Sequence, residues 1–433
     1  MKWKRHRSGW ESCAARRARC APRAPRGSLA SMSAIKPHLA EDEQSTDEEL
    51  DYWDCATETA TSRGGLGRIS VGDEPSALCP TPSEVLDFSH SGLLNMVYVR
   101  KVVAGDFAGA RIAPAVDGKG EVFLWADKMI GSPAWNPAPG GARNSGRLLS
   151  WTTKMGTPSF SLPAGPGSIG GACPGSVAGM SISPLSARQK AAKTVLHVLG
   201  RDASDPIDPA ECVCQFCYAE GGQYSTGSVQ FAQVLRLLWV KKAIHVNMEG
   251  KEVEPHESMF VTVMVEAIKN ADFKSKSEPA HWSGRKFFRL HDSGDFFSIP
   301  YLKAWKAVTN HFPEITFWAP TRVWALGDKV IEAVNEINGD AETSNLVLRP
   351  SAFEVNRHGP KRLGRGWSAA TTVYSPDGKG PDEGFDWDCK AYEAEKGPTC
   401  RGAEAPPDES GKTRIGCRAC WARTDLRVNY TLH

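Results

Sequence analysis

The sequence has no uninterrupted apolar run of the roughly 18–20 residues that a membrane span requires. Its first residues have no apolar core of the kind that a secretory signal needs, and no internal repeat is found. The net charge is only +2, so the whole chain carries no strong field toward nucleic acid or a membrane surface. These absences predict a globular, cytoplasmic protein with no membrane partner.

The amino-terminal region is polar and unevenly charged. Residues 1–27 contain nine Lys and Arg but one Glu, and the acidic stretch "AEDEQSTDEELD" follows. We expect residues 1–85 to be mostly disordered. Residues 1–31 are then either a disordered tail or sequence translated upstream of a start at Met32. Residues 86–150 predict an extension with short strands, 151–380 the core, and 381–433 a cysteine-rich tail.

The core alternates strand-like and helix-like segments. "RKFFRLH", "EITFWAP" and "NLVLRPS" read as strands, and "SIPYLKAWKAVTNHF" and "LGDKVIEAVNEIN" read as helices between them. This alternation predicts an α/β fold with a parallel sheet, which we expect to form a partial (βα) barrel. Sites gather at the carboxyl ends of parallel strands. Those ends carry His291 and the run Ser293-Gly294-Asp295, then Arg322, then Arg349.

Twelve cysteines in a chain without a secretory signal indicate a reducing compartment, where grouped cysteines more often bind metals or do chemistry than form bridges. Eight of them fall into two groups: Cys173, Cys212, Cys214 and Cys217, then Cys389, Cys400, Cys417 and Cys420.

In the first group, Cys214 and Cys217 form a Cys-x-x-Cys pair, whose two sulfurs can turn toward one metal ion or one corner of a cluster. Cys173 is the expected third ligand, and Cys212 either substitutes for Cys214 or is a bystander. Three cysteines on a cubane 4Fe-4S cluster leave one iron open for another ligand. A structural zinc site and a thioredoxin-type redox pair remain alternatives.

The second group lies in a Gly-, Pro- and charge-rich segment that has little apolar material for a core. Metal ligation by Cys389, Cys400, Cys417 and Cys420 would account for its order. A zinc knuckle, a second iron–sulfur cluster, free thiols and a site shared with the first group are all compatible with the spacing.

Six motifs in order resemble the phage and prophage gene product 88 family over roughly residues 148–425: "FSLPAG", "CPG", "CxxCYA", "RLHDSGDFFS.PYLKAW", "FWAPTR" and "LRPSA". More distantly, the chain resembles phage proteins with a Cys-x-x-Cys-Tyr-Ala element that are grouped with radical S-adenosylmethionine enzymes. This second resemblance implies that Cys173, Cys214 and Cys217 ligate a 4Fe-4S cluster whose open iron binds S-adenosylmethionine.

The same resemblance implies that Ser293, Gly294 and Asp295 contact the amino group of that cofactor. Arg322 and Arg349 would bind its carboxylate or an anionic substrate. The sequence departs from those enzymes in two places. Residues 174–213 separate the first two cysteines, and the usual Gly-Gly-Glu-Pro is missing.

Two functions from different classes therefore remain open. The first is an iron–sulfur protein, an enzyme of the radical S-adenosylmethionine kind with an unknown small-molecule or macromolecular substrate. The second is a zinc-stabilised phage or mobile-element protein that binds nucleic acid or a host protein without catalysis. The basic loop "RHGPKRLGRG" at residues 357–366 could contact phosphates, although its composition favours a solvated loop.

Overall fold

The structure is a computed structural model of the whole chain. The residues that it describes all lie in the unit Glu43–His433. They are 109–117, 119–127, 145–152, 155–167, 170–181, 183–273, 284–360, 363–375, 386–389, 403–408, 410–422 and 424–431. The region predicted to be disordered, residues 1–85, lies outside them, so that prediction stays open.

The described strands form three sheets, of which the five-stranded one is central. The strands are β1 (Ile112–Val116), β2 (Val122–Ala126), β3 (Ser145–Arg147), β4 (Ser150–Thr152), β5 (Thr157–Phe160), β6 (Lys286–Leu290), β7 (Ile315–Thr321), β8 (Leu346–Pro350), β9 (Thr371–Tyr374), β10 (Trp387–Asp388) and β11 (Val428–Thr431). The predicted short strands of the extension are present as the antiparallel sheet β1-β2-β3.

The described α-helices are α5 (Leu185–Val198), α6 (Gly227–Ala243), α7 (Met259–Lys269), α8 (Ile299–Asn310), α9 (Asp328–Asn338) and α10 (Ala419–Ala422). The two helices predicted between the strands are α8 and α9, and the Ser298 hydroxyl caps α8 by accepting from the backbone N–H of Tyr301 at 3.3 Å. Helix α5 is not predicted from the sequence. Only Val195 and Leu196 of this helix are buried, so its apolar face is too short to give a clear helical pattern.

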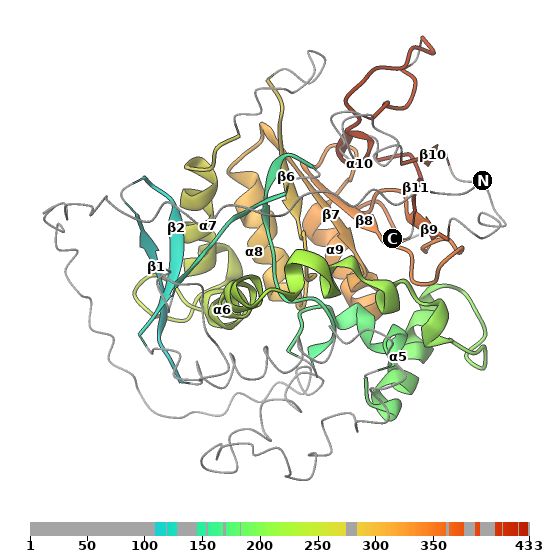
Figure 1. Cartoon of the computed structure of the whole chain (residues 1–433), viewed down its shortest axis with the longest axis horizontal. Helices are drawn as coiled ribbons and strands as arrows, with labels where there is room; N and C mark the ends of the chain where they lie inside the picture. Colours follow the sequence, from blue (N-terminus) through green and yellow to red (C-terminus); the bar gives the residue numbers. More distant parts are fainter. Residues whose placement is uncertain are drawn as a thin grey trace, which may run out of the picture. The chain divides into compact units, whose positions relative to one another are not determined.

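The central sheet has the order β4-β5-β6-β7-β8. Figure 1 shows β6, β7 and β8 side by side in it. Strand β4 pairs antiparallel with β5, and β5, β6, β7 and β8 pair in parallel. Helix α8 connects β6 to β7, and α9 connects β7 to β8. A mixed α/β fold with a parallel sheet is therefore confirmed, whereas curvature into a partial barrel stays a prediction.

One face of this sheet packs against the helices and forms the main core. Phe160 of β5, Phe288 of β6 and Phe317 of β7 are fully buried there with Trp305 of α8 and Phe260 of α7. The Trp305 ring meets those of Phe160 and Phe260 edge-on, with centroids 5.6 and 5.4 Å apart. Successive residues of a strand point to opposite faces, so the residues next to each of these phenylalanines along its strand face the other side of the sheet.

The other face is covered in part by the carboxyl-terminal residues. Phe287 of β6, Trp318 of β7 and Val347 of β8 form a second buried cluster with Trp421 of α10. The indole N–H of Trp421 donates to the carbonyl of Phe288 at 3.2 Å. Strand β11 also pairs in parallel with β9. The described part of the cysteine-rich tail thus packs onto this face of the core sheet. Met155 and Trp318, in the same cluster, also line a cavity beside the tail.

In the described part of the chain, no helix is both long and apolar enough to cross a membrane.

Replacing Trp421 with Ala is expected to lower the free energy of unfolding by about 3–5 kcal/mol, because the side chain is only 2% exposed and leaves a cavity against the sheet. Trp125→Ala is the control, since Trp125 is 46% exposed on β2. Urea unfolding followed by circular dichroism checks both. Equal midpoints for the two variants would mean that the tail does not stabilise the sheet.

Candidate functional site

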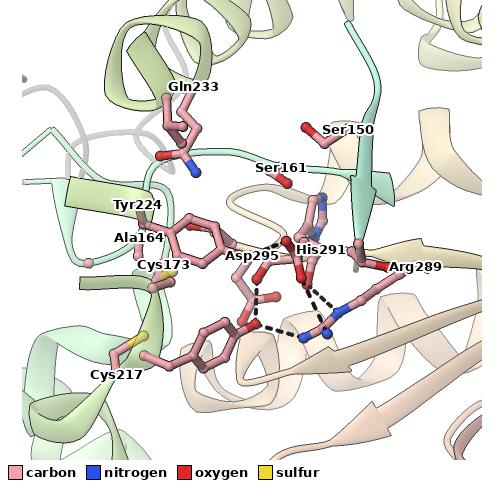
Figure 2. Close-up of a pocket in the computed structure, with 18 of the residues that line it drawn as sticks. Ser150, Ser161, Ala164, Cys173, Cys217, Tyr224, Gln233, Arg289, His291 and Asp295 are labelled. Atoms are coloured by element: carbon pink, nitrogen blue, oxygen red, sulfur yellow. Dashed lines mark hydrogen bonds and ion pairs between the residues drawn. The ribbon is translucent and has the colours of Figure 1, made fainter. Parts of the chain in front are cut away.

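A cavity of about 1330 Å³ opens at the carboxyl ends of β5, β6 and β7. Its wall brings together residues that are far apart in the sequence, as Figure 2 shows for Cys173, Cys217, Arg289 and Asp295. Three of the lining residues are the cysteines of the predicted ligand set: Cys173, Cys214 and Cys217. Cys173 therefore shares a cavity wall with the distant Cys-x-x-Cys pair, and its role as a third ligand stays a prediction.

Cys173 is held by the turn that follows β5. Its backbone N–H donates to the Gly165 carbonyl at 2.9 Å, and the chain continues into the short helix η2 (Pro174–Gly179). Gly175 lies against the loop after β7, where a Cβ atom would stand 2.2 Å from the Arg322 carbonyl oxygen. Only glycine permits this approach. The "CPG" motif thus fixes Cys173 beside Arg322.

The Cys-x-x-Cys pair is held by the chain that follows β8. The short helix η4 (Val213–Phe216) contains Cys214, and the Val213 N–H donates to the Phe353 carbonyl at 2.9 Å. Cys212 lies outside the cavity lining and points its thiol at the Asp208 carbonyl, 3.3 Å away. Cys212 thus has no place in the cavity wall, and whether it binds a metal stays a prediction.

The tyrosine of the "CxxCYA" motif connects the cysteine loop to the loop after β6. The Tyr218 hydroxyl donates to the Asp292 carbonyl and accepts from Arg289 Nη2 at 2.7 Å. Tyr224 donates to the Asp292 carboxylate, which also forms an ion pair with Arg289 at 3.3 Å. Figure 2 shows part of this network beside the cysteines. Through this network the "CYA" and "HDSGD" segments contact each other.

Burial keeps the three thiols protonated. It raises the pKa of Cys217 to about 12, with Glu220 and Cys214 adding to the effect. Burial likewise raises the pKa of Cys173 well above its ordinary value, and Asp295, Cys217 and Cys214 raise it further. A nucleophilic or redox-active cysteine needs a lowered pKa. These thiols are therefore unsuited to act as free nucleophiles, and a metal that bound them would have to displace their protons.

Arg322 supplies positive charge to this group. It hydrogen-bonds Cys214 and opposes the effect of burial, which nonetheless raises the pKa of that thiol. Its Nε donates to the Ala352 carbonyl at 2.7 Å, which fixes the guanidinium in place. A buried arginine beside a set of cysteines would stabilise them as thiolates.

Asp295 lines the same cavity but is already hydrogen-bonded. Its carboxylate accepts from the Thr321 hydroxyl at 2.6 Å and from the Arg322 and Phe296 N–H groups at 2.8 and 2.7 Å. Burial raises its pKa to about 6, and these hydrogen bonds act in the opposite direction. Asp295 thus joins the ends of β6 and β7, and its expected contact with a cofactor ammonium stays a prediction.

Ser293 and Gly294 also line the cavity. The Ser293 hydroxyl is buried and has no hydrogen-bond partner among the described residues. Gly294 has φ +83°, and a Cβ atom there would stand 2.6 Å from that of Leu162. Glycine is therefore needed for the turn itself, while the Ser293 hydroxyl is available to a ligand.

Arg349 is placed elsewhere. It is fully buried outside the cavity lining, and its Nη1 donates to the carbonyls of Ala369 and Leu426 at 2.9 and 2.6 Å. These contacts tie the tail to β8 and account for the burial of Arg349 without a ligand. The role predicted for it in anion binding has no support from its surroundings.

Three cysteines of the second group, Cys389, Cys417 and Cys420, lie close together within the carboxyl-terminal tail. Burial raises the pKa of Cys417 to about 12, and the nearby Cys420 and Cys389 raise it further. These three cysteines line a cavity of only about 10 Å³, and the Cys420 sulfur lies 2.8 Å from the Tyr430 hydroxyl. Cys400 lies outside the described residues.

The described His, Cys, Asp and Glu side chains include no group of three that could hold a metal ion as they stand. The sulfurs of one zinc ion lie within about 4 Å of one another, because each is about 2.3 Å from the metal. A metal bound by either cysteine group would therefore require the thiols to move closer together, and the nature of the metal stays a prediction.

Several lining residues were not predicted from the sequence: Tyr218, Tyr224, Gln233, Arg236 and Arg289. Tyr218 lies inside the "CxxCYA" motif and could have been singled out. Gln233 and Arg236 lie in α6, where a polar residue within a helical pattern is ordinarily solvent-exposed. Only their burial identifies them.

The comparisons with known proteins agree on one relationship. A family model described as "Gene product 88" matches residues 131–423. The gene 88 protein of Mycobacterium phage D29 is 41% identical over 61 residues, which is 14% of this chain and 22% of that protein. The gene 88 protein of Mycobacterium phage L5 is 53% identical over 38 residues, 9% of this chain and 16% of that protein. The matched segments thus span less than a quarter of these relatives. No solved structure matches.

His291 makes stability depend on pH. It is buried with Nε2 2.8 Å from the Tyr301 hydroxyl, and burial, with Arg289 nearby, lowers its pKa to about 3. A depressed pKa gives stability that is complete above about pH 6.5 and is lost as the pH falls toward 3. Between pH 7 and 5 this loss is about 2 kcal/mol.

His291→Gln should lose that part of the pH slope, whereas His256→Gln, a change at an exposed histidine, should keep it. Urea unfolding at several pH values checks both. A full slope in His291→Gln would show that His291 is not the group responsible.

Proposed function

The chain belongs to the gene product 88 family, and we propose that it holds a 4Fe-4S cluster on Cys173, Cys214 and Cys217 and works as an enzyme on a ligand bound in the adjoining cavity. The observation that carries this proposal is the shared wall. Two chain segments far apart in the sequence place three cysteines, of which Cys214 is buried and Cys173 and Cys217 are partly exposed, beside one cavity of about 1330 Å³. A closed structural site has no need of such a space.

The donor set supports a cluster with one open iron. No fourth cysteine of the described residues lines this cavity, since Cys212 points away from it. Arg322, hydrogen-bonded to Cys214, offsets the negative charge that three thiolates would bring. When bound, such a cluster supplies single electrons at the coordination position that the protein leaves open.

The order of the sheet supports the kinship with radical S-adenosylmethionine enzymes. Strands β5 to β8 neighbour one another in chain order, and their connecting helices pack on one face. That arrangement is typical of a (βα) barrel and not of a doubly wound sheet. The proposed cofactor is S-adenosylmethionine, and the unpartnered Ser293 hydroxyl is the group best placed to bind it.

The second cysteine group suits a different role. Cys389, Cys417 and Cys420 surround a gap of about 10 Å³, about the size of one water molecule or ion, under a tail packed on the sheet. We propose that a single zinc ion draws these thiols together and stabilises the tail, with Cys400 as the fourth ligand suggested by the spacing.

The cluster is tested by anaerobic reconstitution with iron and sulfide. The wild-type chain is expected to take up about four irons and to absorb near ~400 nm. Cys214→Ser should lose the absorbance and most of the iron, while Cys212→Ser, which alters a buried thiol outside the cavity, should keep both. A colourless wild-type protein that contains zinc alone would favour the non-catalytic binding protein.

Zinc in the tail is tested by metal analysis of variants. Cys417→Ala should lose one zinc per chain and lower the free energy of unfolding, while the iron content after reconstitution stays unchanged. Iron lost together with the zinc would mean that the two cysteine groups share one site.

A further inference from the structure

We propose that the cavity wall formed by α6 and the residue after β5 binds the base of a nucleotide, free or within a single strand. This subsite lies apart from the cysteine loop and needs no cluster to be present. Figure 2 shows Gln233 and Ser161 along one side of the cavity and Cys217 on another.

The first observation is an unused carboxamide. Gln233 is only 1% exposed, lines the cavity, and has no partner among the described residues for either its Nε2 or its Oε1. The Ser161 hydroxyl is 3% exposed, lines the same cavity and is likewise unpartnered. Buried polar groups are nearly always hydrogen-bonded, since leaving one unpaired costs free energy. A ligand that fills the cavity would supply the partners.

The chemistry of the carboxamide narrows the ligand. Gln233 presents one acceptor and two donor positions side by side in a plane. A nucleobase edge carries a neighbouring donor and acceptor that pair with such a group in bidentate fashion. A carboxylate or phosphate would satisfy only the donor and leave Oε1 unpaired.

The second observation is aromatic. Trp151 of β4 lines the cavity outside the cysteine loop and is 49% exposed. A large aromatic side chain at a cavity mouth provides a flat surface on which a base stacks. Its exposure leaves this surface available to a ligand.

The third observation is charge. Arg236, one helical turn after Gln233, is 4% exposed and lines the cavity. Its guanidinium donates to the carbonyls of Arg147 and Ser161 and to the Ser150 hydroxyl, and it forms no ion pair with a described carboxylate. Asp292, which acts on Arg236 through space, is itself paired with Arg289, so part of the positive charge of Arg236 remains for a ligand. It favours an anionic ligand, such as a nucleotide, over a neutral base.

The size of the cavity leaves room for this ligand. Pockets for small molecules are commonly about 300–1,000 Å³, and this cavity is about 1330 Å³. A nucleotide on the α6 wall can therefore occupy it together with the groups proposed for the cysteine wall.

The proposal is tested by calorimetric titration of the full chain, both iron-free and reconstituted. The probes are AMP, GMP, CMP and UMP, and single-stranded oligonucleotides of each base. We expect at least one base to bind at one site per chain in the iron-free protein. This separates the result from the proposed function, because a chain that takes up no cluster can still bind the nucleotide.

Gln233→Ala is expected to weaken binding about 10- to 100-fold, the loss of one bidentate pair. Gln233→Glu, which replaces the donor with a second acceptor, should change the preferred base. Trp151→Ala, an exposed position, should weaken all bases alike. Gln215→Ala is the control, since Gln215 lies outside the cavity and hydrogen-bonds Ser181.

Binding of mononucleotides that Gln233→Ala weakens supports a free nucleotide as the ligand. Binding of oligonucleotides alone, weakened by the same change, supports a strand as its source. No binding of any probe to the wild-type chain would overturn the proposal. So would binding that Gln233→Ala and Gln233→Glu leave unchanged in strength and in base preference.

Discussion

The structure depends on the burial of polar loops at the carboxyl ends of the parallel strands. Backbone and side-chain groups placed there must find partners, because leaving them unpaired is costly. The loop after β6 provides these partners. Asp292 accepts hydrogen bonds from the hydroxyls of Tyr218 and Tyr224, and Asp295 accepts them from the Thr321 hydroxyl and the Arg322 N–H. These contacts bring the cysteine loop and the strand ends together, so the cavity and its three thiols follow from the same network.

The two cysteine groups show how surroundings separate similar sequences. Both contain a Cys-x-x-Cys pair with a third cysteine nearby, and burial raises thiol pKa values in both. The first borders a cavity of about 1330 Å³ and the second a gap of about 10 Å³. Spacing alone cannot distinguish an open site from a closed one, because the difference lies in what the rest of the chain packs around the sulfurs.

Much of the core could be predicted from the sequence. The apolar strands and the periodic helices between them, from residue 286 to 350, are strong local signals. Of the polar groups at the strand ends, Ser293, Asp295 and Arg322 line the cavity. Arg349 has the same local signal but is fully buried among tail carbonyls, which belong to a distant part of the chain. Gln233 and Arg236 were missed for the opposite reason, since their helix buries a face that a polar pattern assigns to solvent.

The central claim concerns which atoms the three thiols of the cavity wall bind. A crystal structure of the anaerobically reconstituted protein, with anomalous scattering measured on both sides of the iron absorption edge, tests it most directly. The account predicts a compact iron peak bonded to the sulfurs of Cys173, Cys214 and Cys217, with one side facing the cavity. Iron bound elsewhere, or these three sulfurs left without metal, would contradict it.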